Sequence, residues 1–152
     1  MVGLDMLNLK LNADGSCGPT NPEGLASYAF LLSDLETGKA IQTGADKLGN
    51  GLGNNYAEFY GLYEGLKCVS IFYDKSEDKA IQLFVKMDSA LVINVVKKKW
   101  KTSPDKLYYP AALFVFEELR KLRAKGVIIF CDWIPREENS QVDAMSKYQN
   151  FQ

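Results

Sequence analysis

Residues 7–18 read LNLKLNADGSCG, and apolar and polar side chains alternate along most of this stretch. A period of two is typical of a half-buried β-strand, and it places the leucines and Ala13 on one face of that strand. The other face is polar and ends at Asp14, which Gly15 follows. Asp-Gly is also a common turn sequence, because aspartate hydrogen-bonds its own backbone and glycine tolerates positive φ. The stretch predicts a first strand that ends at Asp14, and it leaves open whether Asp14 belongs to a turn or to a site.

The composition limits what the chain can be. Its 152 residues, 47% of them hydrophobic and 24% charged, suit one domain over residues 1–152. With 18 basic and 19 acidic residues the net charge is -1, so any polyanion must bind through a local patch. No apolar stretch approaches the roughly 20 residues that span a bilayer, and the N-terminus lacks the pattern of a signal peptide. We expect a monomeric, cytoplasmic protein that does not bind a membrane.

Cysteine and histidine usage narrows the chemistry. The cysteines Cys17, Cys68 and Cys131 are scattered, odd in number and outside CxxC spacing, which indicates reduced thiols. The chain has no histidine, and this excludes Ser-His-Asp and Cys-His catalysis as well as histidine-ligated zinc. Carboxylates remain as the candidate acid, base or metal-binding groups.

The rest of the chain alternates strand and helix patterns. We expect strands at 25–34 and, more weakly, at 40–46, and then a loop at 47–55 in which Asn54 or Asn55 caps a helix. Further on, the patterns predict a helix at 56–73, a strand at 80–88, helices at 89–100 and 111–126, a buried strand at 127–134 and a final helix in the tail. This order predicts an α/β fold in which helices cover a mixed sheet.

Acidic residues recur at comparable places in these elements. Asp14 ends the first strand, Asp88 ends the fourth, Glu58 lies in the first turn of the intervening helix, and Asp143 lies in the first turns of the last helix. Singly, each reads as a turn residue, a cap or a partner of the helix dipole. Together, acids gathered at the carboxyl ends of strands repel one another and are tolerated mainly beside a divalent cation. An oxygen-only ligand set favours Mg²⁺ or Mn²⁺.

Four segments carry a family resemblance. They are NADGSCG (12–18), NNYAEFYGLYEGLK (54–67), KMDSALV (86–92) and PREENSQVDAMS (135–146), and they resemble the motifs of type 1 ribonuclease H in order and spacing. The resemblance runs from Leu7 to Tyr148. It implies the ribonuclease H-like fold, a five-stranded mixed sheet with three antiparallel strands and then two parallel ones, flanked by helices.

The resemblance also implies an activity, which is cleavage of the RNA strand of an RNA/DNA hybrid with two Mg²⁺ ions, or Mn²⁺ in their place. In that scheme Asp14 bridges both metals, and Asp143 completes the site that activates the attacking water. Glu58 and Asp88 hold the metal on the side of the leaving oxygen. Two metals suit this reaction because they stabilise both the entering and the departing oxygen.

Substrate contacts are implied at two places. The 2′-hydroxyls of RNA would be read by Asn54, Asn55 and the backbone around Ser16 and Cys17. The segment KKKWK is the best local anchor for a nucleic-acid backbone, through Lys97, Lys98, Lys99, Trp100 and Lys101. The alternative interpretation of this segment is a solvated helix end, because lysines also favour the C-terminal turn of a helix.

The chain departs from the family pattern in two respects. Many relatives carry a loop histidine before the last aspartate, and here the chain runs directly from Ile134 to Asn139. In this loop Arg136 is a candidate contact for the phosphate, and its alternative interpretation is a solvated loop arginine. Gly53 and Tyr56 occupy positions at which relatives often grip the phosphate of the DNA strand.

Two alternative functions remain. One is another nuclease of the same fold, such as a junction resolvase or an exonuclease, although exonucleases with a DEDD motif usually have two acids in the first motif. The other is a non-catalytic module that binds nucleic acid or protein. Such a module would have no reason to keep four mutually repelling carboxylates.

Overall fold

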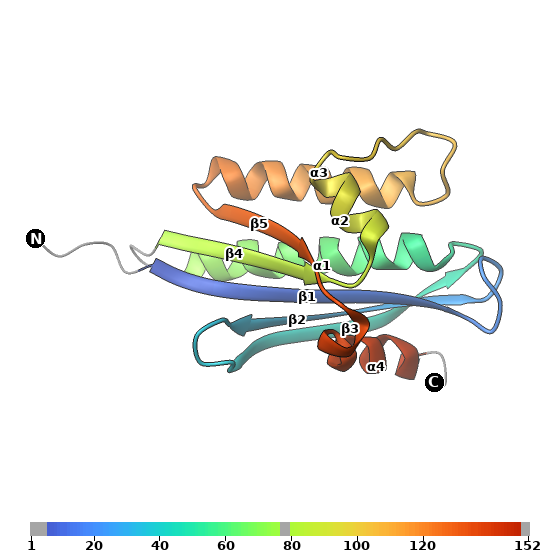
Figure 1. Ribbon diagram of the computed structural model, residues 1–152, viewed down its shortest axis with the longest axis horizontal. Helices are drawn as coiled ribbons and strands as arrows, with labels where there is room; N and C mark the ends of the chain where they lie inside the picture. Colours follow the sequence, from blue (N-terminus) through green and yellow to red (C-terminus); the bar gives the residue numbers. More distant parts are fainter. Residues whose placement is uncertain (1–5, 77–79, 150–152) are drawn as a thin grey trace, which may run out of the picture.

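The computed structural model describes residues 6–76 and 80–149, so the N-terminal residues used in the signal-peptide argument lie outside the described residues. Strands and helices follow the order that the sequence predicts (Figure 1). Their bounds are β1 Met6–Gly18, β2 Leu25–Asp34, β3 Ala40–Asn50, α1 Asn54–Lys75, β4 Ala80–Met87, α2 Ala90–Val96, α3 Tyr109–Ala124, β5 Ile128–Trp133 and α4 Ser140–Tyr148, with a 3₁₀ turn at Arg136–Glu138. Over the described ranges, no helix has the length and apolar character needed to cross a membrane.

The strands form one five-stranded sheet in the order β3-β2-β1-β4-β5. β1 pairs antiparallel with β2, and β2 with β3, whereas β4 runs parallel to both β1 and β5. The predicted mixed sheet, with three antiparallel strands followed by two parallel ones, is confirmed. The pairing of β1 with β4 ends at Asn12 and Lys86, so nearly half of β1, from Ala13 to Gly18, has a sheet neighbour only on the β2 side.

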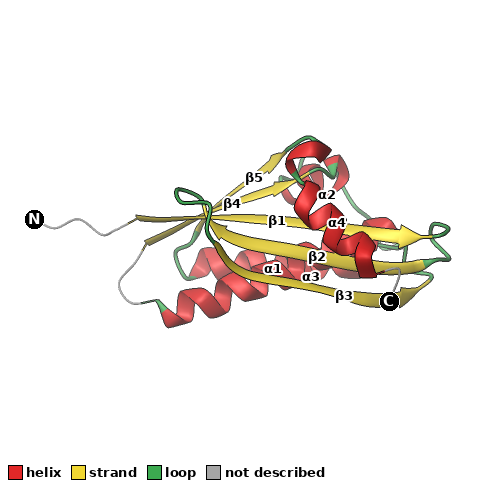
Figure 2. Cartoon of the chain, turned by 90° about the horizontal axis from the view of Figure 1, so that it is seen from below, coloured by secondary structure: helices red, strands yellow, loops and turns green. Residues whose placement is uncertain are grey.

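Helices cover the two faces of the sheet unequally. In Figures 1 and 2, α1 and α3 lie along one face and the short α4 crosses the other face over β1 and β2. The main core lies between the sheet and α1 and α3, where Leu9 and Leu11 of β1 and Phe59 and Leu62 of α1 are fully buried. Each such side chain stabilises the fold by roughly 1.5–3 kcal/mol. The leucine face of the first strand is therefore the core face, as its periodicity predicts.

The start of α1 differs from the prediction. The helix begins at Asn54, and its N-cap is Gly53, which has a φ of 85° and makes no side-chain cap. Instead, Asn21 from the β1–β2 loop accepts a hydrogen bond from the Asn54 amide at 3.0 Å and donates one to the Asn54 side chain at 2.8 Å. Asn54 and Asn55 are thus helical residues, and the cap comes from a residue more than thirty positions earlier in the chain.

Three strands also differ from their predicted form. β1 continues through Asp14 to Gly18, and β3 extends to Asn50 through residues expected to be a loop, because both segments pair with β2. β5 was expected to be buried on both faces. It is an edge strand with Ile128 47% and Phe130 44% exposed, because α4 covers β1 and β2 and leaves this face of β5 open.

Candidate carboxylate site

Asp14 lies within β1, opposite Ala29 of β2, and the turn alternative for Asp14 is wrong. Its side chain is on the face that α4 covers and is 3% exposed. The next residue, Gly15, points to the other face, where a Cβ would come 2.3 Å from the backbone nitrogen of Glu58. Only glycine lets the backbone of α1 approach the strand this closely. Gly15 therefore serves the contact between β1 and α1, and Asp14 faces α4 on the other side of the sheet.

Glu58 comes from the second turn of α1, one turn later than predicted. Burial, and after it the negative charges of Asp88 and Asp143, raise the pKa of its carboxyl to about 7. A hydrogen bond with Ser89, the N-cap residue of α2, and the positive charge of Arg136 act in the opposite direction. Glu58 is therefore a buried acid whose charge is only partly compensated by its protein neighbours.

Asp88 follows the last residue of β4, as the sequence predicts. Its Oδ1 accepts a hydrogen bond from Asn139 Nδ2 at 2.8 Å, and its Oδ2 lies 3.7 Å from Arg136 Nε. Asn139 also donates to the carbonyl of Ala13 at 3.1 Å and accepts a hydrogen bond from Asn12 at 3.1 Å. Asn139 thus ties the residue after β4 to the strand that carries Asp14.

Asp143 lies in the first turn of α4, also as predicted. Its Oδ2 forms an ion pair with Lys147 Nζ at 3.1 Å, one turn further along the same helix. Ser146, on the same helix and fully buried, donates a hydrogen bond to Asp14 Oδ2 at 3.1 Å. α4 therefore presents one acid and one hydroxyl to the buried end of the Asp14 side chain.

The four acids act on one another electrostatically. Burial, and after it the charges of Glu58 and Asp88 and the hydrogen-bonded carboxyl of Asp143, together raise the pKa of Asp14 to about 8. All three of the other acids are among the causes of the raised pKa of Asp14. The structure thus brings together the four acids that the sequence selected, with Asp14 at the centre.

A divalent cation fits this donor set. Oxygen ligands without histidine or thiolate suit Mg²⁺ or Mn²⁺, and a bound cation would reverse the raised pKa values of the buried acids. In the part of the chain that the structure describes, no group of three or more acidic, cysteine or histidine side chains is arranged to hold a metal ion as it stands. The hydrogen bonds and ion pairs to Ser146, Asn139 and Lys147 hold the carboxylates in this arrangement.

The predicted substrate residues fall into two separate groups. Asn54 and Asn55 border a small cavity of about 180 Å³ between the start of α1, the β1–β2 loop and Tyr108. Ser16 and Cys17 lie near the end of β1. The Ser16 hydroxyl donates a hydrogen bond to the carbonyl of Ser146 on α4, and the Cys17 thiol donates one to the carbonyl of Thr20 in the following loop. The turn after α2 consists of four lysines and one tryptophan, namely Lys97, Lys98, Lys99, Trp100 and Lys101. Because α2 ends at Val96, the predicted helix end at residue 100 is four residues too late.

Asn139, Ser146, Ser89 and Lys147 were not singled out from the sequence. Each has a local signal that could have found it. Asn139 immediately precedes the helix that carries Asp143. Three and four positions after Asp143 come Ser146 and Lys147, and Ser89 follows Asp88 directly. Residues at these spacings lie one helical turn from, or next to, an acid.

A five-stranded mixed sheet with this order, and acids contributed by β1, α1, the end of β4 and α4, defines a ribonuclease H-like α/β protein. The chain belongs to the reverse transcriptase-like family, whose pattern it matches over residues 12–149. The predicted fold class and family resemblance are both confirmed.

Solved structures of ribonucleases H share the fold. The N-terminal ribonuclease H domain of a Mycobacterium tuberculosis protein is similar with a TM-score of 0.77 at 23% identity, over 95% of this chain and 94% of that one. Ribonuclease H1 from Halobacterium salinarum aligns with a TM-score of 0.75 at 22% identity, over 93% and 96%. LC11-RNase H1, in a complex with an RNA/DNA hybrid, aligns with a TM-score of 0.71 at 25% identity, over 90% and 92%.

Proposed function

We propose that this protein is a metal-dependent endoribonuclease that hydrolyses the RNA strand of RNA/DNA hybrids. The observation that carries the proposal is the convergence of Asp14, Glu58, Asp88 and Asp143 from four separate elements, with the pKa of Asp14 raised to about 8 by burial and by the other acids. Such a group is unfavourable unless a cation neutralises it. The structure of LC11-RNase H1 with an RNA/DNA hybrid supports the choice of substrate.

In this proposal the four carboxylates would hold two Mg²⁺ ions, or Mn²⁺. When bound, these ions would supply Lewis-acid stabilisation of the entering and leaving oxygens of the phosphodiester. Ser146 and Asn139 orient Asp14 and Asp88 through their hydrogen bonds, so that the carboxylates do not have to be ordered when the substrate arrives. Arg136, paired with Asp88 and 71% exposed, is positioned to meet the phosphate backbone of the substrate.

The start of α1 and the basic turn provide the proposed substrate contacts. Asn54 and Asn55 line the small cavity beside the β1–β2 loop, where side-chain amides can bond to 2′-hydroxyls and phosphate oxygens. Ser16 and Cys17 contribute backbone groups near this cavity. Lys97–Lys101 would hold a neighbouring part of the backbone, with the half-exposed Trp100 beside a sugar or base.

The proposal includes the whole chain as one catalytic domain that acts as a monomer in the cytoplasm. These parts rest on composition and on the span of the family motifs.

The decisive experiment is cleavage of an end-labelled RNA/DNA hybrid in parallel with RNA/RNA, DNA/DNA and single-stranded RNA. Each substrate is incubated with Mg²⁺, with Mn²⁺ and with EDTA, using the wild type and Asp14→Asn. We expect internal cuts confined to the RNA of the hybrid, dependent on metal and abolished in Asp14→Asn. Removal of a central metal ligand or catalytic carboxylate lowers rates by orders of magnitude.

A matched control is Asp46→Asn, which removes one exposed carboxylate on β3, on the far side of the sheet order from β4. It should cut like the wild type. Cutting of all substrates alike would favour another nuclease of the same fold. Binding of the hybrid without cutting, with either metal, would favour the non-catalytic module and overturn the proposal.

A further inference from the structure

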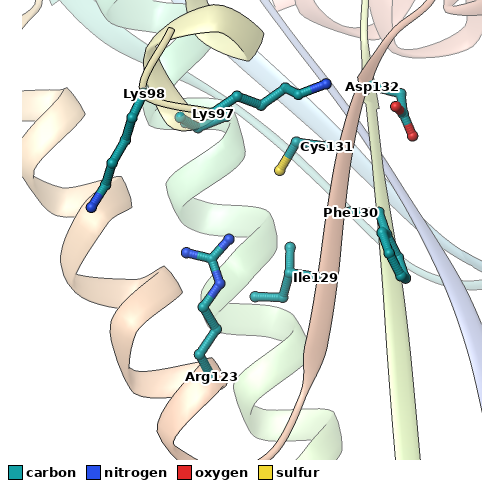
Figure 3. A pocket seen from close by; sticks show the side chains of 8 residues that line it. Lys97, Lys98, Arg123, Ile129, Phe130, Cys131 and Asp132 are labelled. Carbon is teal, nitrogen blue, oxygen red and sulfur yellow. The ribbon is translucent and has the colours of Figure 1, made fainter. Parts of the chain in front are cut away.

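A second polar pocket lies away from the four acids, at the open edge of the sheet. It has a volume of about 390 Å³ and is bounded by the end of α2, the last turns of α3 and one side of β5. Figure 3 shows Lys98, from the turn after α2, and Arg123, from α3, pointing toward one another, with Ile129 and Cys131 of β5 facing the space between them. Asp143 lies on α4, which covers the opposite face of the sheet.

The pocket concentrates unpaired positive charge. Lys97, Lys98 and Arg123 line it, and among the described residues none of the three forms an ion pair or a side-chain hydrogen bond. The one acid on the lining, Asp132, lies 3.7 Å from Lys86 on the neighbouring strand. Lys97, Lys98 and Arg123 are exposed cations on the lining of one hollow, in a chain whose net charge is -1, and a bound anion would reduce their mutual repulsion.

The backbone at Lys98 is an independent indication. Lys98 has a φ of 60°, and it is the one described non-glycine residue with a positive φ. It follows the C-terminal end of α2, where glycine is the favoured residue because it has no Cβ. A lysine in this conformation costs stability, and such residues cluster at binding sites. This backbone conformation places Lys98 on the rim of the pocket, where its side chain stays exposed.

The surroundings favour a phosphate with an organic substituent. A larger cavity of about 580 Å³ shares Lys98 and Arg123 with the pocket, and its lining also includes Arg120 and the apolar side chains of Val96, Phe116 and Leu119. A ligand can thus place a charged group among the cations and a flat or apolar group beside them. The Cys131 thiol is buried and its pKa is raised to about 11, so it stays protonated and does not act as a nucleophile.

We propose that Lys97, Lys98 and Arg123 form a binding site for a phosphate group, separate from the carboxylate site. The phosphate would belong to a nucleic-acid strand or to a free nucleotide or inorganic phosphate, since all of these offer the same oxyanion to a guanidinium and two ammonium groups. The site does not require the carboxylates to be catalytic. Arg123 distinguishes the proposed phosphate site from the lysine turn after α2 alone, because Arg123 comes from a different helix, α3.

The test measures binding in EDTA, so that neither metal binding nor cleavage contributes. The probes are inorganic phosphate, a nucleoside monophosphate, a short single-stranded DNA with a 5′-phosphate and the same DNA without it, each titrated by calorimetry. We expect Arg123→Gln to weaken binding of the tightest probe roughly tenfold or more, because the variant cannot form the charge-assisted hydrogen bonds of the guanidinium. Arg123 is exposed, so this change leaves the core intact. The probe that binds most tightly identifies the source of the phosphate.

Lys98→Gly separates binding from stability. It removes the cation and relieves the unfavourable φ, so the ligand-free variant should melt roughly 2–4 °C higher than the wild type and yet bind the probe roughly tenfold more weakly. Lys75→Gln, at the exposed end of α1, is the matched control and should bind like the wild type. The proposal is overturned if no probe binds the wild type, or if Arg123→Gln and Lys98→Gly both bind as the wild type does.

Discussion

Asp14 and Gly15 act on opposite sides of β1. Asp14 carries its carboxylate to the α4 face, and Gly15 allows the backbone of Glu58 to approach on the other face. The two residues have complementary roles, because a site that combines an acid from β1 with an acid from α1 needs the carboxylate of Asp14 and also a close approach of the α1 backbone to β1, which Gly15 allows. Asp-Gly here has the sequence of a turn and the structure of a strand.

Gly15→Ala tests the close approach. A Cβ at this position would stand 2.3 Å from Glu58 N and 2.4 Å from the carbonyl carbon of Ala57, so α1 must move. We expect the unfolding free energy, measured by urea titration, to fall by about 1–3 kcal/mol, together with a large drop in cleavage because Glu58 is displaced.

The comparison variant is Gly38→Ala. Its added Cβ meets nothing within 4 Å, although φ is 75°, so it should cost only about 1 kcal/mol and leave cleavage unchanged. Equal reductions of cleavage in the two variants would contradict this role of Gly15.

The raised pKa of Asp14 predicts how stability depends on pH in the absence of metal. The folded protein keeps the proton up to about pH 8, whereas the unfolded chain releases it near its ordinary value of 3.8. The tighter proton binding of Asp14 in the folded state therefore stabilises the protein fully below the unfolded pKa of 3.8, and this stabilisation is lost as the pH rises to the folded pKa of about 8. In EDTA, Asp14→Asn should be more stable than the wild type at about pH 8 by on the order of 2 kcal/mol, measured by urea unfolding.

Mg²⁺ should reduce this difference, because it binds the folded wild type and stabilises it. Asp46→Asn, which changes an exposed acid, should follow the wild-type pH curve. If the unfolding free energies of the wild type and Asp14→Asn depend identically on pH in EDTA, Asp14 is not held among buried, repelling acids.

The helix α1 depends on a residue outside itself. Its own first residues provide no side-chain cap, and the amide and side chain of Asn54 bond instead to Asn21 of the β1–β2 loop. The loop and the helix therefore form one unit beside the cavity that Asn54 and Asn55 line. Substitutions in this loop should therefore alter the positions of Asn54 and Asn55, the proposed substrate contacts.

Asn21→Ala should cost about 1 kcal/mol, the usual cost of removing an N-terminal cap, and lower the melting temperature by roughly 2–4 °C. Because the start of α1 is then less ordered, we also expect the KM for the hybrid to rise more than kcat falls. Asn50→Ala, which removes one hydrogen bond at 3.3 Å to the same loop, is the control. An unchanged KM in Asn21→Ala would separate the loop from substrate binding.

At the scale of the whole molecule, the charge balance leaves nucleic-acid binding to local cations. The net charge is -1, and the lysines of the basic turn are among the exposed cations without an ion pair in the described residues. A protein of this kind should bind a hybrid with a modest dependence on salt, set by the number of phosphates that it neutralises.

The combined substitution of Lys99→Gln and Lys101→Gln should lower the slope of log K against log salt by about 0.9 for each phosphate that the variant no longer neutralises. The measurement uses the Asp14→Asn background in EDTA, so that no cleavage occurs. Lys39→Gln, on the β2–β3 turn, is the control and should leave the slope unchanged. If the slope in the double variant equals that of its parent, the basic turn does not contact the substrate backbone.

Local patterns in the sequence determined most of the elements of this protein. The alternation in β1 and the helical spacing of Phe59, Leu62 and Leu66 each report which face of an element is apolar, and the structure buries those faces. The positions of Asp88 and Asp143 followed from the same patterns, whereas Asp14 lies inside β1 and Glu58 lies one turn further into α1 than predicted. A periodicity describes a residue relative to its own element, so this much requires no knowledge of the neighbours.

Only the tertiary structure decided what depends on contacts between distant segments. The open face of β5, the cap that Asn21 gives to α1, and the link of Asn139 from Asp88 to β1 each join residues far apart in the chain. The Asp-Gly sequence could be interpreted as a turn because its local conformational preference is the same whether it lies in a turn or in a strand. Pairing with β2 and the approach of α1 decided for the strand, since tertiary contacts outweigh a local preference of about 1 kcal/mol.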